Sequence, residues 1–207
     1  FPFTKLMVAN ASVNQGAAVI VTSLGAARAA GVPDGRLIHI GAGAAAHEAY
    51  DAMARAGWTT PPGMQVAITE TLSRNGLTGA DVDLVELYSC FPCVPKMARR
   101  VLGWPAERPA TVHGGLTFGG GPVANYMTHA IAAMVRKLRS DGRTGFLFGN
   151  GGFCEHNHCI VLSRDALPGA VFPQDYDAQA IADAQRGPIP ELTFFFNDTA
   201  TTEIYTV

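Results

Sequence analysis

Hydrophobic and polar positions along the chain follow two patterns: short continuous apolar runs, and longer segments with apolar residues at helical spacing. The short runs are typical of buried strands, and the longer segments are typical of helices with one buried face. We expect strands at residues 17–22, 36–40, 82–87, 146–148 and 158–162. We expect helices at residues 24–30, 45–56, 62–74, 123–138 and, as a short piece, 177–186. This order of signals, with a hairpin at the end, indicates a mixed α/β sheet.

Composition and charge narrow the class of protein. Of the 207 residues, 48% are hydrophobic and 15% are charged, and the formal net charge is −2. A folded domain with a real core is therefore expected, and no basic excess is present to attract nucleic acid or an anionic membrane. No apolar run reaches the roughly 18 residues of a membrane span, and no signal-peptide pattern is visible. Four cysteines at this length do not indicate a disulfide framework, so we expect a cytoplasmic protein.

The C-terminal part of the chain differs from its middle. Residues 193–207 combine three consecutive phenylalanines with a threonine-rich run, which would also suit a β-strand. The stretch NDTATTEIYT at residues 197–206, however, resembles the translation of a common sequencing adapter. We therefore expect residues 193–207 to carry no function. Residues 166–192 contain four prolines and are expected to form a linker toward a further segment.

Four segments, in order along the chain, resemble the C-terminal half of a thiolase. NASVNQGAA at residues 10–18 resembles the phrase that ends the first thiolase domain. DLVELYSCF at residues 83–91 resembles the strand and loop that carry the NEAF or HDCF motif. GGLTFGGGP at residues 114–122 has the spacing of the GG…GHP loop, and GNGG at residues 149–152 stands where the CxGG loop would stand.

The resemblance to sterol-carrier-type thiolases and acetyl-CoA acetyltransferases implies a thiolase-like α/β fold. In that fold a mixed five-stranded sheet carries helices on both faces and forms one half of a five-layer architecture. The implied domains are the end of an N-terminal thiolase domain, the C-terminal thiolase domain, the linker and the adapter-like end, at residues 1–30, 31–165, 166–192 and 193–207. The implied partners are acyl-CoA, an N-terminal thiolase half, a second copy in a homodimer, and a small OB-fold partner or appended domain. No cofactor is implied, because the CoA thioester is the substrate.

The chain differs from thiolases at the three positions of the C-terminal half that carry catalytic side chains in that family. Thiolases transfer acyl groups through a Cys nucleophile of the first half, and the second half supplies an Asn or His, a His and a Cys. Tyr88, Gly121 and Gly149 stand at those three positions here. Because glycine has no side chain to accept a proton, the usual mechanism cannot run through the last two. Backbone N–H groups of the Gly-rich turns are the remaining candidate donors.

Two tyrosines and one histidine are the candidate catalytic replacements. ELYSCF, with Tyr88, and GGGPVANYM, with Tyr126, resemble thiolase-like aldolases in which tyrosines at these places transfer protons. A phenol performs this task if its pKa is lowered; the alternative is that both tyrosines pack with their hydroxyls satisfied. His156, or Cys154 beside it, follows the loop at residues 149–152 and is the candidate substitute for the lost Cys or His.

The other expected site residues bind substrate. They are Cys90, Phe91, His113, Gly120, Gly121, Pro122, Gly149, Asn150 and Gly151. Cys90 is equally typical of a small buried apolar residue. Cys90 and Cys93, together with Cys154, His156 and His158, which share one face if they lie on a strand, also have zinc-ligand character. Because Cys90 falls in the thiolase loop, we expect no metal.

Three functions remain open. The first is a thiolase-like acyltransferase of lipid metabolism that acts on acyl-CoA thioesters with non-standard active-site residues. The second is a CoA-ester aldolase or retro-aldolase that uses Tyr88 and Tyr126. The third, favoured by Gly121 and Gly149, is a catalytically degenerate acyl-CoA-binding protein. We expect an enzyme, with this chain inactive when alone; thioester exchange, ketone release or binding without turnover distinguishes the three.

Overall fold

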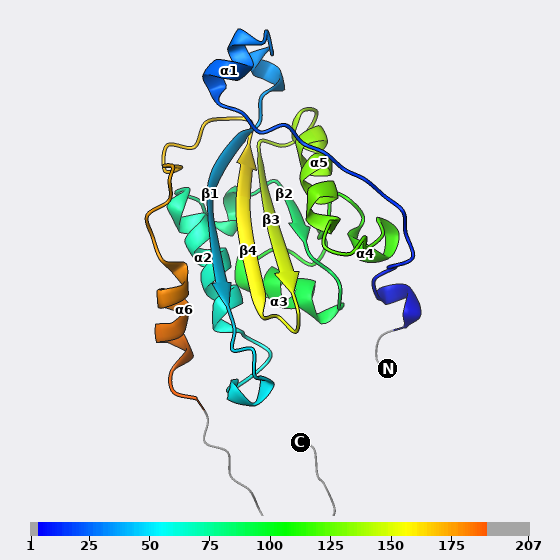
Figure 1. Ribbon diagram of the computed structural model, residues 1–207, viewed down its shortest axis with the longest axis vertical. Helices are drawn as coiled ribbons and strands as arrows, with labels where there is room; N and C mark the ends of the chain where they lie inside the picture. Colours follow the sequence, from blue (N-terminus) through cyan, green and yellow to red (C-terminus); the bar gives the residue numbers. More distant parts are fainter. Residues whose placement is uncertain (1–3, 190–207) are drawn as a thin grey trace, which may run out of the picture.

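The computed structural model describes residues 4–189, and a single mixed sheet organises them (Figure 1). Its order is β1-β4-β3-β2, with β1 and β3 antiparallel to β4 and β2 parallel to β3. The strands are β1 (His39–His47), β2 (Leu84–Leu87), β3 (Thr144–Gly151) and β4 (His156–Ser163). β3 and β4 form the expected closing hairpin, in which Gly151 lies opposite His156.

Helices cover both faces of the sheet, as expected from the sequence. They are α1 (Leu24–Ala29), α2 (Pro62–Arg74), α3 (Cys93–Leu102), α4 (Gly115–Phe118), α5 (Tyr126–Leu138) and α6 (Ala178–Arg186). Phe146 and Phe148 of β3 pack in one core with α2 and α3, whereas Leu147 between them packs in a second core with α5. This alternation follows from the period of two along a strand. α6 lies beside β1 and α2, where Ala178 and Ala182 are buried (Figure 1).

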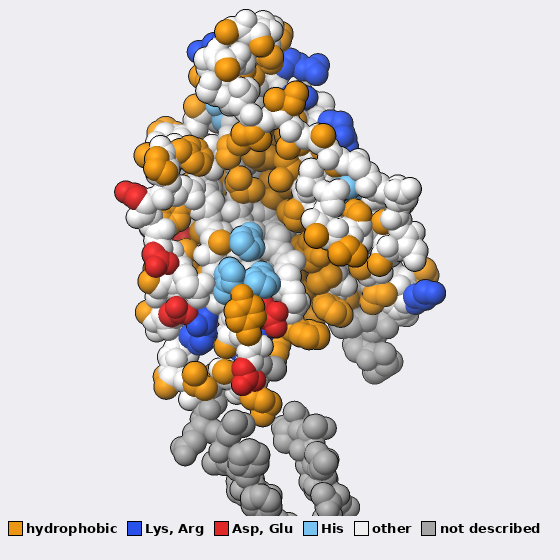
Figure 2. Space-filling model, viewed as in Figure 1, with side chains coloured by type: hydrophobic (Ala, Val, Ile, Leu, Met, Phe, Trp, Pro, Cys, Tyr) orange, Lys and Arg blue, Asp and Glu red, His pale blue; other side chains and the backbone are white. Residues whose placement is uncertain are grey.

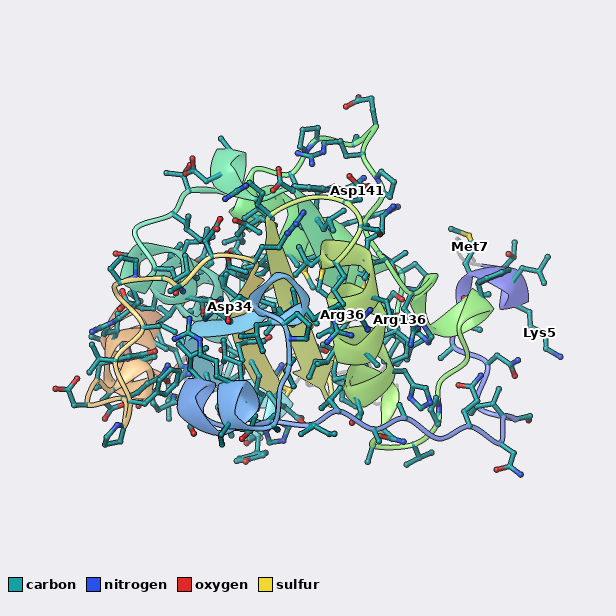
Figure 3. The ribbon with its side chains drawn as sticks, turned by 90° about the horizontal axis from the view of Figure 1, so that it is seen from above. Lys5, Met7, Asp34, Arg36, Arg136 and Asp141 are labelled. Carbon is teal, nitrogen blue, oxygen red and sulfur yellow. The ribbon has the colours of Figure 1, made fainter. Side chains whose placement is uncertain are left out.

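The segment before α1 crosses the molecule on the side of α5. Figure 3 shows the 3₁₀ turn Lys5–Met7, with Lys5 and Met7 labelled, beside α4. Two hydrogen bonds attach the following residues to α4: Thr117 Oγ1 donates to Val8 O (2.8 Å), and Asn10 N donates to Leu116 O (3.0 Å). The N-terminal segment is therefore fixed against the Gly-rich loop that contributes to the candidate site.

Two expected elements are absent and two unexpected helices are present. Residues 17–22 are not a strand: the run crosses the top of Figure 1 with Ile20 94% exposed, because its backbone pairs with no sheet edge among the described residues. The described sheet consequently has four strands, not five. Residues 45–56 are not a helix either, since Ala45 and Ala46 pair with β4, and this pairing overrides the helix preference of alanine. The sequence pattern did not predict α3 and α4.

Other expectations agree with the structure or fall outside it. The helices expected at residues 24–30, 62–74, 123–138 and 177–186 are α1, α2, α5 and α6, shifted by at most three residues at an end. Within residues 4–189, no helix is both long and apolar enough to cross a membrane. The adapter-like residues 193–207 lie outside the described residues, as does the very end of the expected linker.

Candidate functional site

A buried carboxylate organises the candidate site. Glu86 lies on β2, where its strand neighbours are apolar, and it is 0% exposed. Its carboxylate accepts hydrogen bonds from Thr111 Oγ1 (2.8 and 2.7 Å) and from the backbone N–H groups of Val112 (2.8 Å) and His113 (2.9 Å). The Tyr126 hydroxyl donates a further hydrogen bond to it. A buried charge requires such donors, and here they come from two separate parts of the chain, residues 111–113 and Tyr126.

Thr111 extends this network into the Gly-rich loop. While its hydroxyl donates to Glu86, its oxygen accepts from the N–H groups of Gly114 (2.8 Å) and Gly115 (3.0 Å). Ser89 Oγ, just after β2, accepts from Leu116 N (3.1 Å). The loop therefore takes its shape from Thr111 and from Ser89, which follows β2. Gly114 and Gly115 supply the positive φ values of 107° and 70° that the turn requires.

Tyr126 is the first residue of α5 and is held firmly in the network. Its side chain is 3% exposed, and its hydroxyl is bonded to Glu86. Burial and, after it, the negative charge of Glu86 and the bond to it raise the pKa of Tyr126 far above its usual value. The phenol is consequently protonated at neutral pH, the opposite of the lowered pKa that the sequence-based hypothesis required.

Tyr88 lies next to Tyr126 but is much less constrained. The two rings meet edge to face, with centroids 5.6 Å apart. Tyr88 is half-buried, and burial, followed by the nearby Cys90, raises the pKa of Tyr88 as well. Its hydroxyl has no hydrogen-bond partner within residues 4–189. The structure thus brings the two predicted tyrosines together, but only the Tyr88 hydroxyl remains available.

Two histidines complete the group around Tyr126. The centroid of the His113 ring lies 5.5 Å from that of Tyr126 and 5.8 Å from that of His129, on which it stacks. His129 Nδ1 is 2.9 Å from Asn125 O, so this nitrogen carries the proton and Nε2 is left as an acceptor. Nε2 of His113 and Nε2 of His129 are both buried without a partner in the described part of the chain. Buried ring nitrogens without a partner require an explanation, and a proton-transfer site provides one.

The loop after Tyr88 places Cys90 and Phe91 at the border of this group. Cys90 is half-buried and packs against both cores, and burial is the main reason that the pKa of its thiol is raised. The Phe91 ring stacks on Phe153 of the β3–β4 turn, with centroids 6.2 Å apart. Cys90 therefore lies in the apolar environment expected of a small buried residue. Phe91 connects the loop to the hairpin of β3 and β4.

The predicted loop residues Gly120, Gly121 and Pro122 lead into α5. Gly121 N donates to Asn10 O (2.8 Å), so this N–H is already engaged and does not face a ligand. Gly120 has a φ of 80°, and a Cβ there would lie 2.9 Å from side-chain atoms of Val13 and Gln15. Pro122 O accepts from Asn125 N (3.0 Å) in the turn before the helix. These residues form the contact between the N-terminal segment and the site.

Gly149, Asn150 and Gly151 end β3. A Cβ on Gly149 would lie 3.4 Å from Met127 of α5, so the absence of a side chain at Gly149 allows β3 to pack close to this helix. Asn150 Nδ2 donates to His156 O (3.2 Å) and Asn157 Oδ1 (3.0 Å), while its Oδ1 is buried without a partner among the described residues. Asn150 therefore stabilises the hairpin.

His156 lies in a different group from the tyrosines. Its ring is 4.7 Å from that of His47 and 5.6 Å from that of Tyr50, measured between centroids. Within residues 4–189, no hydrogen bond or ring contact joins His156 to Tyr88 or Tyr126. His47, His156 and His158 are the one group of described residues with three or more potential metal ligands in reach of one another; the cysteines of the zinc alternative are not in it.

A pocket of about 330 Å³ opens beside the network of Glu86 and Thr111. It lies between the loop after β2, α3 and the Gly-rich loop, and its lining includes Ser89, Lys96, Arg99, Thr111, Gly114 and Gly115. Lys96 and Arg99 give the lining a positive charge that suits an anionic ligand, and two nitrogens of the Arg99 guanidinium are already held by Ala106 O and Arg108 O.

Sequence reasoning missed Glu86, Thr111 and His129. A signal for Glu86 was present, because a carboxylate inside the apolar run at residues 82–87 must find donors when the strand is buried. No comparable signal marked Thr111, because its role comes from its hydrogen bonds to the backbone of Gly114 and Gly115, which only the folded loop forms. His129 falls within the helix expected at residues 123–138, but no motif marked it as a site residue.

Comparisons with known proteins identify the fold. No protein-family model and no curated protein matches the chain. The fold is similar to that of a monomeric SCP2-thiolase-like protein type 1 from Mycobacterium smegmatis, with 29% identity and a TM-score of 0.71 over 81% of this chain and 37% of that chain. It is also similar to human mitochondrial 3-ketoacyl-CoA thiolase, with 20% identity and a TM-score of 0.53 over 70% of this chain and 34% of that chain.

The chain therefore has a thiolase-like fold, as the sequence resemblance implied. It spans about a third of the length of the solved structures that it matches.

Proposed function

We propose that the protein is a thiolase-like enzyme that acts on acyl-CoA thioesters, with Tyr88 and His113 as its proton-transfer groups. One observation carries this proposal. Glu86 holds Tyr126 and the Gly-rich loop in place, while next to the Tyr126 ring the Tyr88 hydroxyl and His113 Nε2 have no partner among the described residues. A rigid support beside two free proton-transfer groups is the arrangement that general acid–base catalysis needs.

The reaction that this arrangement favours is retro-aldol cleavage of a 3-hydroxyacyl-CoA. On substrate binding the His113 ring turns its buried Nε2 toward the 3-hydroxyl group. Nε2 accepts the proton of that group, and the bond between the α- and β-carbons breaks. The electron pair of that bond passes to the thioester as an enolate, and the Tyr88 hydroxyl then protonates the α-carbon. The proton held by His113 returns to the Tyr88 phenolate, which restores both groups. The products are a ketone or aldehyde and a shortened acyl-CoA, and no oxidant or reductant is consumed. The raised pKa of Tyr88 suits the donor, because the phenol is protonated when the enolate forms.

Acyl transfer, the function first implied by the resemblance, finds less support in the site. It requires a nucleophile, and burial raises the pKa of the Cys90 thiol, which keeps the reactive thiolate scarce. An oxyanion hole at Gly121 is also disfavoured, since its N–H is bonded to Asn10 O. Acyl transfer by this protein would therefore depend on a nucleophile from outside these residues.

The adjacent pocket supports a CoA ester as ligand. Lys96 and Arg99 belong to its lining, where they suit the phosphates of CoA, and Ser89 and Thr111 connect the pocket to the Glu86 network. The chemistry of the lining does not select an acyl chain.

The experiment is a product analysis with matched tyrosine variants. The full-length protein that contains this chain is purified and incubated with 3-hydroxyacyl-CoA esters, including tertiary alcohols, and the products are identified by mass spectrometry. We expect ketone and shortened acyl-CoA from the wild type, a loss of at least about 100-fold in turnover with Tyr88→Phe, and no change with the control Tyr50→Phe. Tyr50 is an exposed tyrosine away from this group. Thioester exchange without ketone would replace the proposal by acyl transfer, and binding without turnover would replace it by a degenerate binder.

A further inference from the structure

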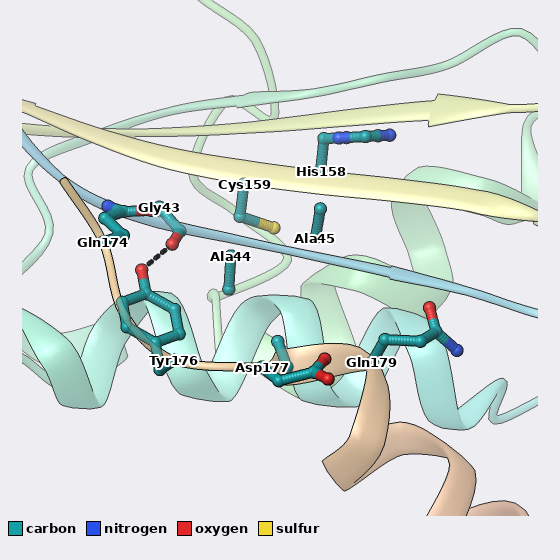
Figure 4. A pocket seen from close by; sticks show the side chains of 10 residues that line it. Gly43, Ala44, Ala45, His158, Cys159, Gln174, Tyr176, Asp177 and Gln179 are labelled. Atoms are coloured by element: carbon teal, nitrogen blue, oxygen red, sulfur yellow. Dashed lines mark hydrogen bonds between the residues drawn. The ribbon is translucent and has the colours of Figure 1, made fainter.

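Three histidines come together on the face of the sheet that also carries α5. In the pairing of β1 with β4, His47 lies directly opposite His156, and His158 lies two residues further along β4. Residues two apart on a strand point to the same side, so the three imidazoles share one face. Figure 4 shows His158 and Ala45 pointing to one side of the strands and Ala44 pointing to the other. Figure 2 shows the three histidines as one group on an open surface.

The geometry of the group is close to that of a metal site. One ring nitrogen from each of the three histidines can be chosen so that all three lie within 4.8 Å of one another. The ring centroids of His47 and His156 are 4.7 Å apart, and those of His47 and His158 are 5.8 Å apart. Three imidazoles around a tetrahedral zinc ion, each about 2.0 Å from it, have nitrogens about 3.3 Å apart. Small rotations of the side chains close this difference, since the backbone positions are already fixed by the ladder.

The surroundings leave these imidazoles as the available ligands. Within residues 4–189, the three rings have no hydrogen bond and no ion pair. The neighbouring carboxylates are engaged, because Glu48 pairs with Arg186 (3.5 Å) and Glu155 pairs with Arg55 (3.4 Å). Opposite His158 on β1 stands Ala45, whose single methyl group leaves room for an ion.

We propose that His47, His156 and His158 bind one divalent transition-metal ion, with zinc as the expected occupant. Imidazole is a preferred ligand of zinc, and three protein ligands leave the fourth tetrahedral position open to water or a small anion. The exposed His158 places this fourth position on the solvent side. The site is separate from the group around Tyr126 and does not depend on the proposed function.

Metal analysis of the 207-residue chain tests the proposal. The chain is made without a polyhistidine tag, stripped with a chelator, and equilibrated with Zn²⁺ by dialysis before the bound metal is measured. We expect one ion per chain in the wild type and an affinity at least about tenfold weaker in His158→Gln and in His47→Gln, because even the loss of an outer-shell partner costs that much. His39→Gln is the matched control: it removes a histidine from the same strand outside the group, and it should bind like the wild type.

Two further measurements use the wild type alone and do not rely on folded variants. Co²⁺ should give the intense visible bands of a four-coordinate site, and Zn²⁺ should protect these three histidines from chemical acylation while His39 stays reactive. An absence of stoichiometric zinc, equal weakening by His39→Gln, or protection spread evenly over all surface histidines would each overturn the proposal and indicate adventitious binding only.

Discussion

The Tyr126 hydroxyl donates a hydrogen bond to the Glu86 carboxylate, and this contact joins the start of α5 to β2 inside the protein. Both side chains are buried, and the same carboxylate holds Thr111 and two backbone N–H groups of the following loop. In the proposed function Tyr126 is therefore a positioning residue, whereas the half-buried Tyr88 next to it has a hydroxyl without a partner among the described residues. This division of roles leads to predictions that separate stability from catalysis.

Glu86→Gln should destabilise the fold. A glutamine keeps one acceptor oxygen but directs an NH₂ group at donors that the carboxylate satisfied, leaving buried N–H groups without partners. We expect a loss of at least about 2 kcal/mol of unfolding free energy, measured as a lower urea midpoint at unchanged slope. Glu107→Gln, at an exposed position, is the control and should stay within about 0.5 kcal/mol of the wild type. Equal midpoints for the two variants would contradict the buried network.

The two tyrosines should respond differently to loss of the hydroxyl. Tyr126→Phe leaves Glu86 one donor short, so we expect it to lower the unfolding free energy by about 1 to 3 kcal/mol. Tyr88→Phe removes a hydroxyl without a partner among the described residues, and its stability should change by no more than about 0.5 kcal/mol. Urea unfolding of both variants measures this. If Tyr88→Phe were the more destabilising of the two, the assignment of Tyr126 as the positioning residue would fail.

The four cysteines should differ in reactivity. Cys93 is exposed, whereas burial and then the neighbouring Cys93 and Cys90 raise the pKa of the Cys154 thiol to about 11, and burial raises that of the fully buried Cys159 well above its usual value. Because the thiolate is the reactive form, alkylation at neutral pH should label Cys93 first and leave Cys159 unlabelled until unfolding. Peptide mapping by mass spectrometry gives the order. Early labelling of Cys159 would show that β4 is more open than described.

Much of the fold was predictable from the sequence because long periodic segments determine it. The helix over residues 62–74 was predicted at its observed bounds, and the hairpin of β3 and β4 followed from apolar runs around glycines. The strand expected at residues 17–22 was wrong, since an apolar run becomes a strand only beside an available sheet edge. α3 was not predicted, because Pro92 and Pro95 interrupt the helical sequence pattern, although proline is tolerated in the first turn of a helix.

The candidate site was predictable only in part. The resemblance pointed to Tyr88, Tyr126 and His113, and the structure brings these three together. It could not reveal that Tyr126 is locked by Glu86, because that depends on side-chain packing across 40 residues of sequence. The group of His47, His156 and His158 depends on strand register, and a one-residue shift would have put His47 on the opposite face.

The raised pKa of Tyr126 predicts a loss of stability at alkaline pH. In the unfolded chain this phenol ionises near its ordinary pKa of 10.0, whereas the buried phenol of the folded protein stays protonated to higher pH. The unfolded state then binds fewer protons than the folded state, so stability falls as pH rises above about 10. One such group lowers the unfolding free energy by up to about 1.4 kcal/mol per pH unit in that range.

The change of unfolding free energy with pH, compared between the wild type and Tyr126→Phe, distinguishes the ionisation of Tyr126 from the loss of its hydrogen bond. Tyr126→Phe is expected to be less stable at neutral pH, but its unfolding free energy should fall less steeply than that of the wild type above pH 10. The buried thiols contribute equally to both proteins and cancel in the difference. Urea unfolding between pH 7 and about pH 11 measures both curves. Parallel curves would mean that Tyr126 ionises as readily in the folded protein as in the unfolded chain, and that the Glu86 carboxylate does not hold it protonated.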